Sequence, residues 1–192
     1  MIIISLLSSP AVYISAASSL RPNVALLRRA CATTASPDFC FNYLSKTPSV
    51  ASASRRSLPA LAAAITDTGL TYAKLMREYA SNKAAAPETR AAAAGRPAAY
   101  AECARLLGDT ATQLEIAAQM IEQIASAATA VDDASYSLMR SGDGVAACKQ
   151  KLAAVKVEDR YVKVSSKHVE VYSVAADNIL TDLKRNGKKV IH

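Results

Sequence analysis

Apolar residues recur every three or four positions through four long segments of this chain, and this spacing is the feature that most limits its possible folds. Such a period places one apolar stripe along one side of an α-helix, where it is buried against other helices. The segments span residues 57–82, 97–126, 130–153 and 160–185. The stripes consist of Leu58, Leu61, Ile65, Thr68, Tyr72, Leu75 and Tyr79; Cys103, Leu107, Thr110, Leu114, Ala117, Ile121 and Ile124; Val131, Ala134, Leu138, Ser141, Val145, Cys148 and Leu152; and Val162, Ser165, Val169, Tyr172, Ala176, Ile179 and Leu183.

Short polar or proline-containing connections separate the four segments, at residues 83–96, 125–130 and 154–160. Helices of about 25 residues are about 37 Å long, and short connections make consecutive helices antiparallel. The sequence therefore predicts an all-α fold, an up-down-up-down four-helix bundle.

Local signals mark several helix ends. Ser57 is a candidate N-cap with Pro59 in the first turn, and Asn186-Gly187 supplies a stop for the last helix. The third segment carries Ser141-Gly142-Asp143-Gly144 in its interior, where each glycine costs up to about 1 kcal/mol relative to alanine. We therefore expect a kink or a local break there.

The composition agrees with a folded helical chain of one domain. The 192 residues are 51% hydrophobic and 5% aromatic, with no Trp, and the apolar fraction is too high for a disordered chain. No run of 18 strongly apolar residues follows the N-terminus, which excludes a bundle of membrane helices. Six Gly and seven Pro are few for a sandwich or a barrel.

The first 20 residues contain no charged side chain and indicate a secretory leader. Met1 to Leu7 is apolar, and Ala16-Ala17-Ser18 supplies the small side chains of a cleavage site. The alternative is an apolar first helix in an intracellular helical interaction module. We expect a signal peptide at 1–18, a helical hairpin at 19–46, the four-helix bundle at 47–186 and a basic tail at 187–192.

Four cysteines follow the leader, and an even number in a secreted chain favours two disulfides. Zinc is the alternative, but the chain has no CxxC and only two histidines. Cys103 and Cys148 both fall on apolar stripes and lie equally far from the turn between the second and third helices, so they meet in an antiparallel pair. By elimination, Cys31 pairs with Cys40 and ties the short hairpin.

These features together resemble the plant pectin methylesterase and invertase inhibitor family. The resemblance rests on the leader, on Cys31 and Cys40 with eight residues between them, and on one cysteine in each of the two middle helices. It extends to the residues around Cys103 (Tyr100 to Ala111), to the stretch from Asp132 to Cys148, and to Asn178-Ile-Leu in the last helix.

The resemblance implies a secreted protein that inhibits a carbohydrate-active enzyme in a stoichiometric, one-to-one complex. In the pectin branch of the family, the outer faces of the second and third helices cover the substrate cleft of pectin methylesterase. In the invertase branch, a Pro-Lys-Phe segment between those helices enters the active site of acid invertase. This chain has Ala130-Val131-Asp132-Asp133 there, which favours pectin methylesterase, although Ser141-Gly142-Asp143 resembles a stretch of the invertase inhibitors.

An interface on those two helices needs exposed side chains that are already ordered, so that docking loses little entropy. We expect Ile116, Tyr136 and Met139 to point outward as apolar anchors, although surface scatter or burial under the N-terminal hairpin is the alternative. The candidate interface residues are Ile116, Gln119 and Gln123 on the second helix, and Asp133, Tyr136, Met139 and Arg140 on the third.

The net charge of +7 comes partly from the pairs Arg28-Arg29 and Arg55-Arg56 and from the tail with Lys184, Arg185, Lys188 and Lys189. A solvated surface is the simplest interpretation, and a weak, salt-sensitive attraction to pectin is the functional alternative. The tail has no interleaved aromatic residues, so we expect no nucleic-acid partner. No membrane contact is expected after leader cleavage, and no N-glycosylation sequon is present.

No catalytic motif, phosphate-binding loop or cluster of metal ligands appears, so we expect neither an enzyme nor a cofactor or metal. His168, beside Lys167, is interpreted as an ordinary exposed histidine, and Asp132 and Asp133 as residues that favour the start of the third helix. The expected location is the apoplast or cell wall, with the vacuole as alternative. A secreted helical protein that inhibits nothing remains an alternative function.

Overall fold

The structure is a computed structural model that describes residues 22–87, 95–124 and 129–188. The expected signal peptide and most of the basic tail lie outside the described residues. Four long helices form the bundle: α4 (Leu58–Ala85), α6 (Arg96–Glu122), α7 (Ala130–Ala154) and α8 (Arg160–Lys188). Three short helices precede them: α1 (Val24–Cys31), α2 (Pro37–Leu44) and α3 (Pro48–Ala53).

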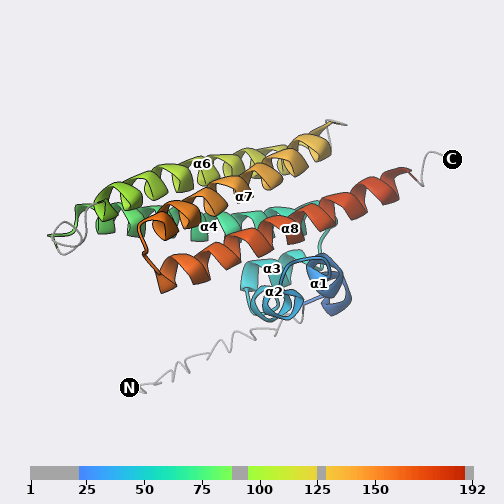
Figure 1. Ribbon diagram of the computed structural model, residues 1–192. Helices are drawn as coiled ribbons and strands as arrows, with labels where there is room; N and C mark the ends of the chain where they lie inside the picture. The colour runs from blue at the N-terminus through green and yellow to red at the C-terminus, as the bar shows by residue number, and fades with distance from the viewer. Residues whose placement is uncertain (1–21, 88–94, 125–128, 189–192) are drawn as a thin grey trace, which may run out of the picture.

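The predicted bundle is confirmed. Each long helix packs against two of the others: α4 and α7 each contact both α6 and α8 (Figure 1). Within the described ranges all regular structure is helical, and no helix there is long and apolar enough to cross a membrane. The short helices lie together beside α8, with α1 and α2 packed on α8 and α3 on α4 (Figure 1).

The apolar stripes form the core for three of the four helices. On α6, α7 and α8, nearly all of the expected stripe residues are buried. On α4 the stripe is right only in its first half, where Leu61 and Ile65 are buried, and wrong in the second, where Leu75 is 47% exposed. The buried face of this half of α4 consists of Gly69, Ala73, Met76 and Ala80 instead. Small residues are favoured there because α4 packs closely against both α6 and α8.

The helix ends agree with the sequence at one signal and differ at another. Ser57 caps α4, where its side chain accepts a hydrogen bond of 3.2 Å from the Ala60 amide. The stop expected at Asn186-Gly187 is wrong, since α8 continues through both residues to Lys188. The short helix α3 was not expected from the sequence.

The break expected at Ser141-Gly142-Asp143-Gly144 is also wrong, because α7 runs through these residues without interruption. A Cβ at Gly144 would lie only 2.4 Å from Oγ1 of Thr110 and 2.6 Å from the carbonyl oxygen of Leu106 on α6. Gly144 therefore serves the close approach of two helix backbones rather than a break in one of them.

The hairpin is tied to the bundle by Asn178 on α8. Its Nδ2 donates a hydrogen bond of 2.7 Å to the carbonyl of Ala30 at the end of α1, and its Oδ1 accepts one of 3.0 Å from Thr33. Arg29 and Asp182 add an ion pair of 2.6 Å between the same two helices. One asparagine side chain thus satisfies a carbonyl that the end of α1 leaves without a helical partner.

Candidate functional site

Helices α6 and α7 carry the candidate site and are joined covalently. Cys103 and Cys148 form a disulfide with a Cα–Cα distance of 4.4 Å, and Cys31 and Cys40 form a second one in the hairpin, with a Cα–Cα distance of 5.6 Å. All four cysteines are buried. The disulfide lies one helical turn from Gly144, so the two backbones come close together along this stretch.

A buried chain of hydroxyl groups fixes α6 and α7 against α8. The Thr110 hydroxyl on α6 donates to the carbonyl of Ser141 at 3.2 Å. The Ser141 hydroxyl donates to the carbonyl of Leu138 at 2.7 Å and lies 2.8 Å from the hydroxyl of Ser173 on α8. Each hydroxyl has a partner, so this polar layer orients the helices without leaving an unsatisfied group in the core.

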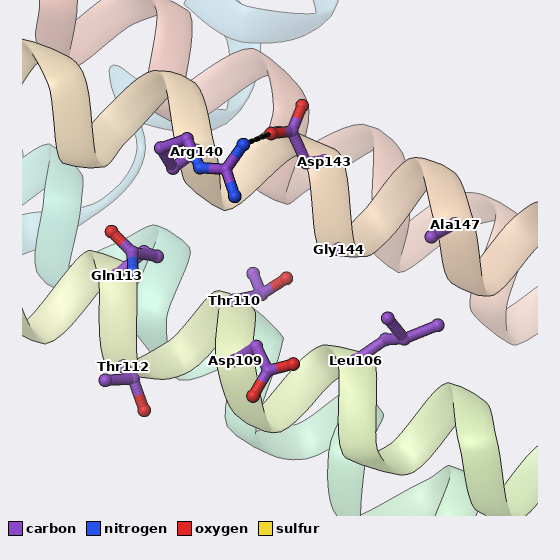
Figure 2. A pocket seen from close by; sticks show the side chains of 9 residues that line it. All are labelled: Leu106, Asp109, Thr110, Thr112, Gln113, Arg140, Asp143, Gly144 and Ala147. Carbon is purple, nitrogen blue, oxygen red and sulfur yellow. Dashed lines mark hydrogen bonds and ion pairs between the residues drawn. The ribbon is translucent and has the colours of Figure 1, made fainter.

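A groove of about 410 Å³ runs between α6 and α7 on the outer side of this layer (Figure 2). Arg140 and Asp143 line it from α7 and are joined by an ion pair of 2.8 Å. Asp109 lines it from α6 and pairs with Arg105, also at 2.8 Å. The groove therefore presents one guanidinium and two carboxylates, with Thr112 and Gln113 from α6 beside them.

The seven candidate interface residues lie on this pair of helices, but the structure does not bring all of them together. Tyr136 and Met139 are 59% and 64% exposed, and the hairpin does not cover them. Ile116, expected to point outward, is half-buried instead, on a helix that packs against both α4 and α7. Four polar candidates are exposed: Gln119, Gln123, Asp133 and Arg140.

Only Arg140 among the candidates lines the α6–α7 groove, and Met139 lines a second hollow between α7 and α8. The sequence reasoning missed Asp109, Gln113 and Asp143. Asp109, Gln113 and Ile116 are spaced by four and three positions, so the helical period that located the candidates could also have found these groove residues.

His168 is buried, with 3% of its surface exposed, so the expectation of an exposed histidine is wrong. Its ring stacks on Tyr72 of α4 with centroids 4.1 Å apart, meets Phe39 and Tyr43 of α2, and lies 2.8 Å through Nδ1 from the Tyr172 hydroxyl. Burial, and then the positive charge of Lys167, lowers the pKa of His168 to about 4. A neutral imidazole therefore joins the hairpin to the bundle at neutral pH.

Asp159 connects three helices at the end of the bundle where α8 begins. One oxygen accepts hydrogen bonds from the hydroxyls of Tyr79 on α4 and Tyr100 on α6, at 2.9 and 2.7 Å, and the other caps α8 through the Val162 amide. Burial alone would raise the pKa of Asp159, but these hydrogen bonds outweigh it and lower the pKa. Burial and the bond to Asp159 raise the pKa of Tyr79 to about 12 and that of Tyr100 still further.

No group of three or more potential metal ligands occurs within residues 22–87, 95–124 and 129–188. The fold is a four-helix bundle with one disulfide between α6 and α7 and a disulfide-tied helical hairpin beside it, and its candidate interface residues lie on α6 and α7, most of them exposed. Over residues 25–187, the sequence matches the family described as plant invertase/pectin methylesterase inhibitor. The chain belongs to this family, whose members inhibit enzymes and are not enzymes themselves.

Solved structures of two related proteins share the fold. A mutant form of a pectin methylesterase inhibitor from Arabidopsis has a TM-score of 0.63 and 20% identity, over 79% of this chain and 92% of that one. A pectin methylesterase inhibitor from Arabidopsis thaliana has a TM-score of 0.56 and 17% identity, over 83% and 96%. A comparison with curated protein sequences found no match.

Proposed function

We propose that this protein is a secreted inhibitor of pectin methylesterase that docks with the outer faces of α6 and α7 over the substrate cleft of the enzyme, in a one-to-one complex. The observation that carries the proposal is the pair of exposed side chains Tyr136 and Met139 on α7, the helix whose Arg140 lines the α6–α7 groove. Helices α6 and α7 are joined by a disulfide, so these groups are ordered before a partner arrives and little entropy is lost on docking.

Two further observations favour the esterase as target over acid invertase. The solved relatives above are named as pectin methylesterase inhibitors. The start of α7 carries Ala130-Val131-Asp132-Asp133 and no Pro-Lys-Phe segment. Ser141-Gly142-Asp143, the stretch that resembles invertase inhibitors, supports the alternative only weakly, since Ser141 is buried in the hydroxyl layer and serves packing.

Secretion, to the apoplast or the vacuole, is part of the proposal. Two buried disulfides are typical of proteins that fold in an oxidising compartment. The test is the mass of the protein from its native source, where the loss of about 18 residues is expected. An intact N-terminus with four free thiols would contradict it.

The inhibitory function is tested by assaying the oxidised protein in parallel against one pectin methylesterase and one acid invertase. We expect inhibition of the esterase only. Inhibition of the invertase alone would identify the alternative target, and inhibition of neither enzyme would favour a non-inhibitory interaction protein of the same fold.

The docking surface is tested with Tyr136→Ala, Met139→Ala and Arg140→Ala. Each change removes an exposed side chain, so we expect inhibition to weaken about tenfold or more while the melting temperature stays unchanged. Leu75→Ala on α4 and Arg56→Ala before α4 remove exposed side chains of the same kinds elsewhere, and serve as matched controls. Unchanged inhibition by all three α7 variants would remove this surface from the proposal.

A further inference from the structure

The turn between α7 and α8 concentrates positive charge at the end of the bundle where Asp159 lies. Residues 149–167 contain six Lys or Arg and two acidic residues. Asp159 is already engaged by Tyr79, Tyr100 and the Val162 amide, which leaves Glu158 as the one other carboxylate of this segment. Asp159 keeps its negative charge in these bonds, so the segment carries a formal excess of four positive charges.

Most of these cations form no ion pair in the part of the chain that the structure describes. Lys149 pairs with Glu170, and Lys167 lies over the ring of Phe39. The four that remain without an ion pair are Lys151, Lys156, Arg160 and Lys163, all of them exposed. By contrast, Arg105 on α6, Arg140 on α7 and Lys184 on α8 all form ion pairs.

A groove of about 650 Å³ lies among these cations. Its floor is apolar, since Leu152 and Val162 are buried, and Val164 lies beside it with 46% of its surface exposed. The charged groups that line it are Lys149, Arg160 and Lys163, with Glu158 and Asp159. An apolar floor with a few charged groups around it is the usual composition of a site for an organic ligand.

We propose that this groove binds an acidic polysaccharide, a chain of uronic acid residues with free carboxylates. Each sugar ring offers an apolar face of C–H groups to the accessible side chains of Val157 and Val164, and a carboxylate at its edge to Arg160 and Lys163. The choice of ligand rests on the proposed function, because removal of methyl esters from pectin leaves such a chain. The site lies at the α7–α8 turn and shares no lining residue with the α6–α7 groove.

The proposal is tested by equilibrium binding of the full chain, with both disulfides formed, to polygalacturonate in the absence of any enzyme. We expect binding at low ionic strength that weakens about tenfold at physiological salt, and no binding to fully methyl-esterified pectin. Poly-glutamate and vesicles of phosphatidylglycerol are the competing ligands. Binding to either one as tight as to polygalacturonate would overturn the assignment to a polysaccharide.

Two charge-reversal variants separate a site from the effect of net charge. Arg160→Glu with Lys163→Glu should weaken binding about tenfold or more, because both groove cations are reversed. Arg55→Glu with Arg56→Glu changes the net charge equally, also at the start of a long helix, and should weaken binding less than about twofold. Equal losses in the two variants would show attraction by overall charge alone and would overturn the site.

The apolar floor and the link to inhibition need their own measurements. Val164→Asn changes no charge, and it should weaken polygalacturonate binding while leaving the salt dependence unchanged. Esterase inhibition, measured on a short substrate in the same buffer, should be unaffected by Arg160→Glu with Lys163→Glu. Polysaccharide binding without esterase inhibition would refute the proposed function alone, and inhibition without polysaccharide binding would refute this site alone.

Discussion

Gly144 and Gly142 lie two positions apart on α7 and have opposite surroundings. A Cβ at Gly144 would meet Thr110 Oγ1 and the backbone of Leu106, whereas a Cβ at Gly142 would meet no atom within 4 Å. A backbone carbonyl cannot rotate away as a flexible side chain can. Only one of the two glycines is therefore required by packing, although in sequence they look alike.

We expect Gly144→Ala to lower the free energy of unfolding by about 1–3 kcal/mol, because it forces α6 and α7 apart. Gly142→Ala should raise it by up to about 1 kcal/mol, because alanine favours the helix and nothing obstructs its methyl group. Urea unfolding of the two variants checks both signs. Equal destabilisation by the two changes would mean that α7 needs flexibility here rather than close approach.

His168 makes the stability of the protein depend on pH. Its pKa is about 4 in the folded protein and about 6.5 when unfolded, so the unfolded chain binds a proton more readily between these values. The free energy of unfolding should therefore fall as the pH is lowered from 6.5 to 4, by up to about 3 kcal/mol, and this contribution should level off below pH 4. Urea unfolding across this range measures the slope.

The control is His168→Gln, which cannot titrate and should be less stable at pH 7 but flatter between pH 6.5 and 4. The lowered pKa of Asp159 adds its own loss of stability only at still lower pH, as this carboxylate becomes protonated. If the wild-type protein and His168→Gln lost stability in parallel across the window, the acid sensitivity would belong to another group.

Among the elements, the hairpin was predicted as a unit but not in its position on the bundle. The cysteine spacing indicates that two short helices are linked, whereas their place on α8 depends on contacts between residues far apart in sequence, such as Asn178 with Ala30. His168 was wrongly predicted to be exposed for the same reason, since Phe39 and Tyr43 of α2 pack against its ring. Helical period determines which side of a helix is apolar, not which neighbour covers its edges.

We expect Asn178→Ala to loosen the hairpin, because it removes the bonds to Ala30 and Thr33 and leaves a carbonyl without a partner. The loss should be about 1–2 kcal/mol. Hydrogen exchange should show reduced protection of α1 and unchanged protection of α6. Asn42→Ala, an exposed asparagine on α2 in the same hairpin, should leave both helices as protected as in the wild type.

For the whole molecule, the bundle and its helix order follow from sequence because four regular stripes and short connections leave few other arrangements. The candidate surface follows only in part. Tyr136 and Met139 are exposed as expected, but Ile116 is half-buried, and the groove includes Asp109 and Asp143, which a pattern of exposed apolar residues does not indicate. A polar groove forms where two helices face each other, so the apolar stripe of a single helix does not predict it.

The two disulfides should contribute unequally to the stability of the whole chain. Cys103 and Cys148 are 45 positions apart, and Cys31 and Cys40 are 9 apart. On the chain-entropy model, replacing the long pair by alanines should cost about 4 kcal/mol and replacing the short pair somewhat under 3 kcal/mol. Calorimetric melting of the two double variants checks the order. A larger loss from the short pair would show that native contacts around the hairpin outweigh loop entropy.

The Asp159 contact gives the protein a built-in optical reporter. The chain has no Trp, so its near-ultraviolet signal comes mainly from its eight tyrosines, and the pKa values of Tyr79 and Tyr100 are raised by burial and by the bond to this carboxylate. Their phenolate absorbance should emerge only in strongly alkaline solution. Burial also raises the pKa values of Tyr72 and Tyr172, so the part of the alkaline absorbance that shifts in Asp159→Asn reports whether the ends of α4, α6 and α8 are gathered around this carboxylate.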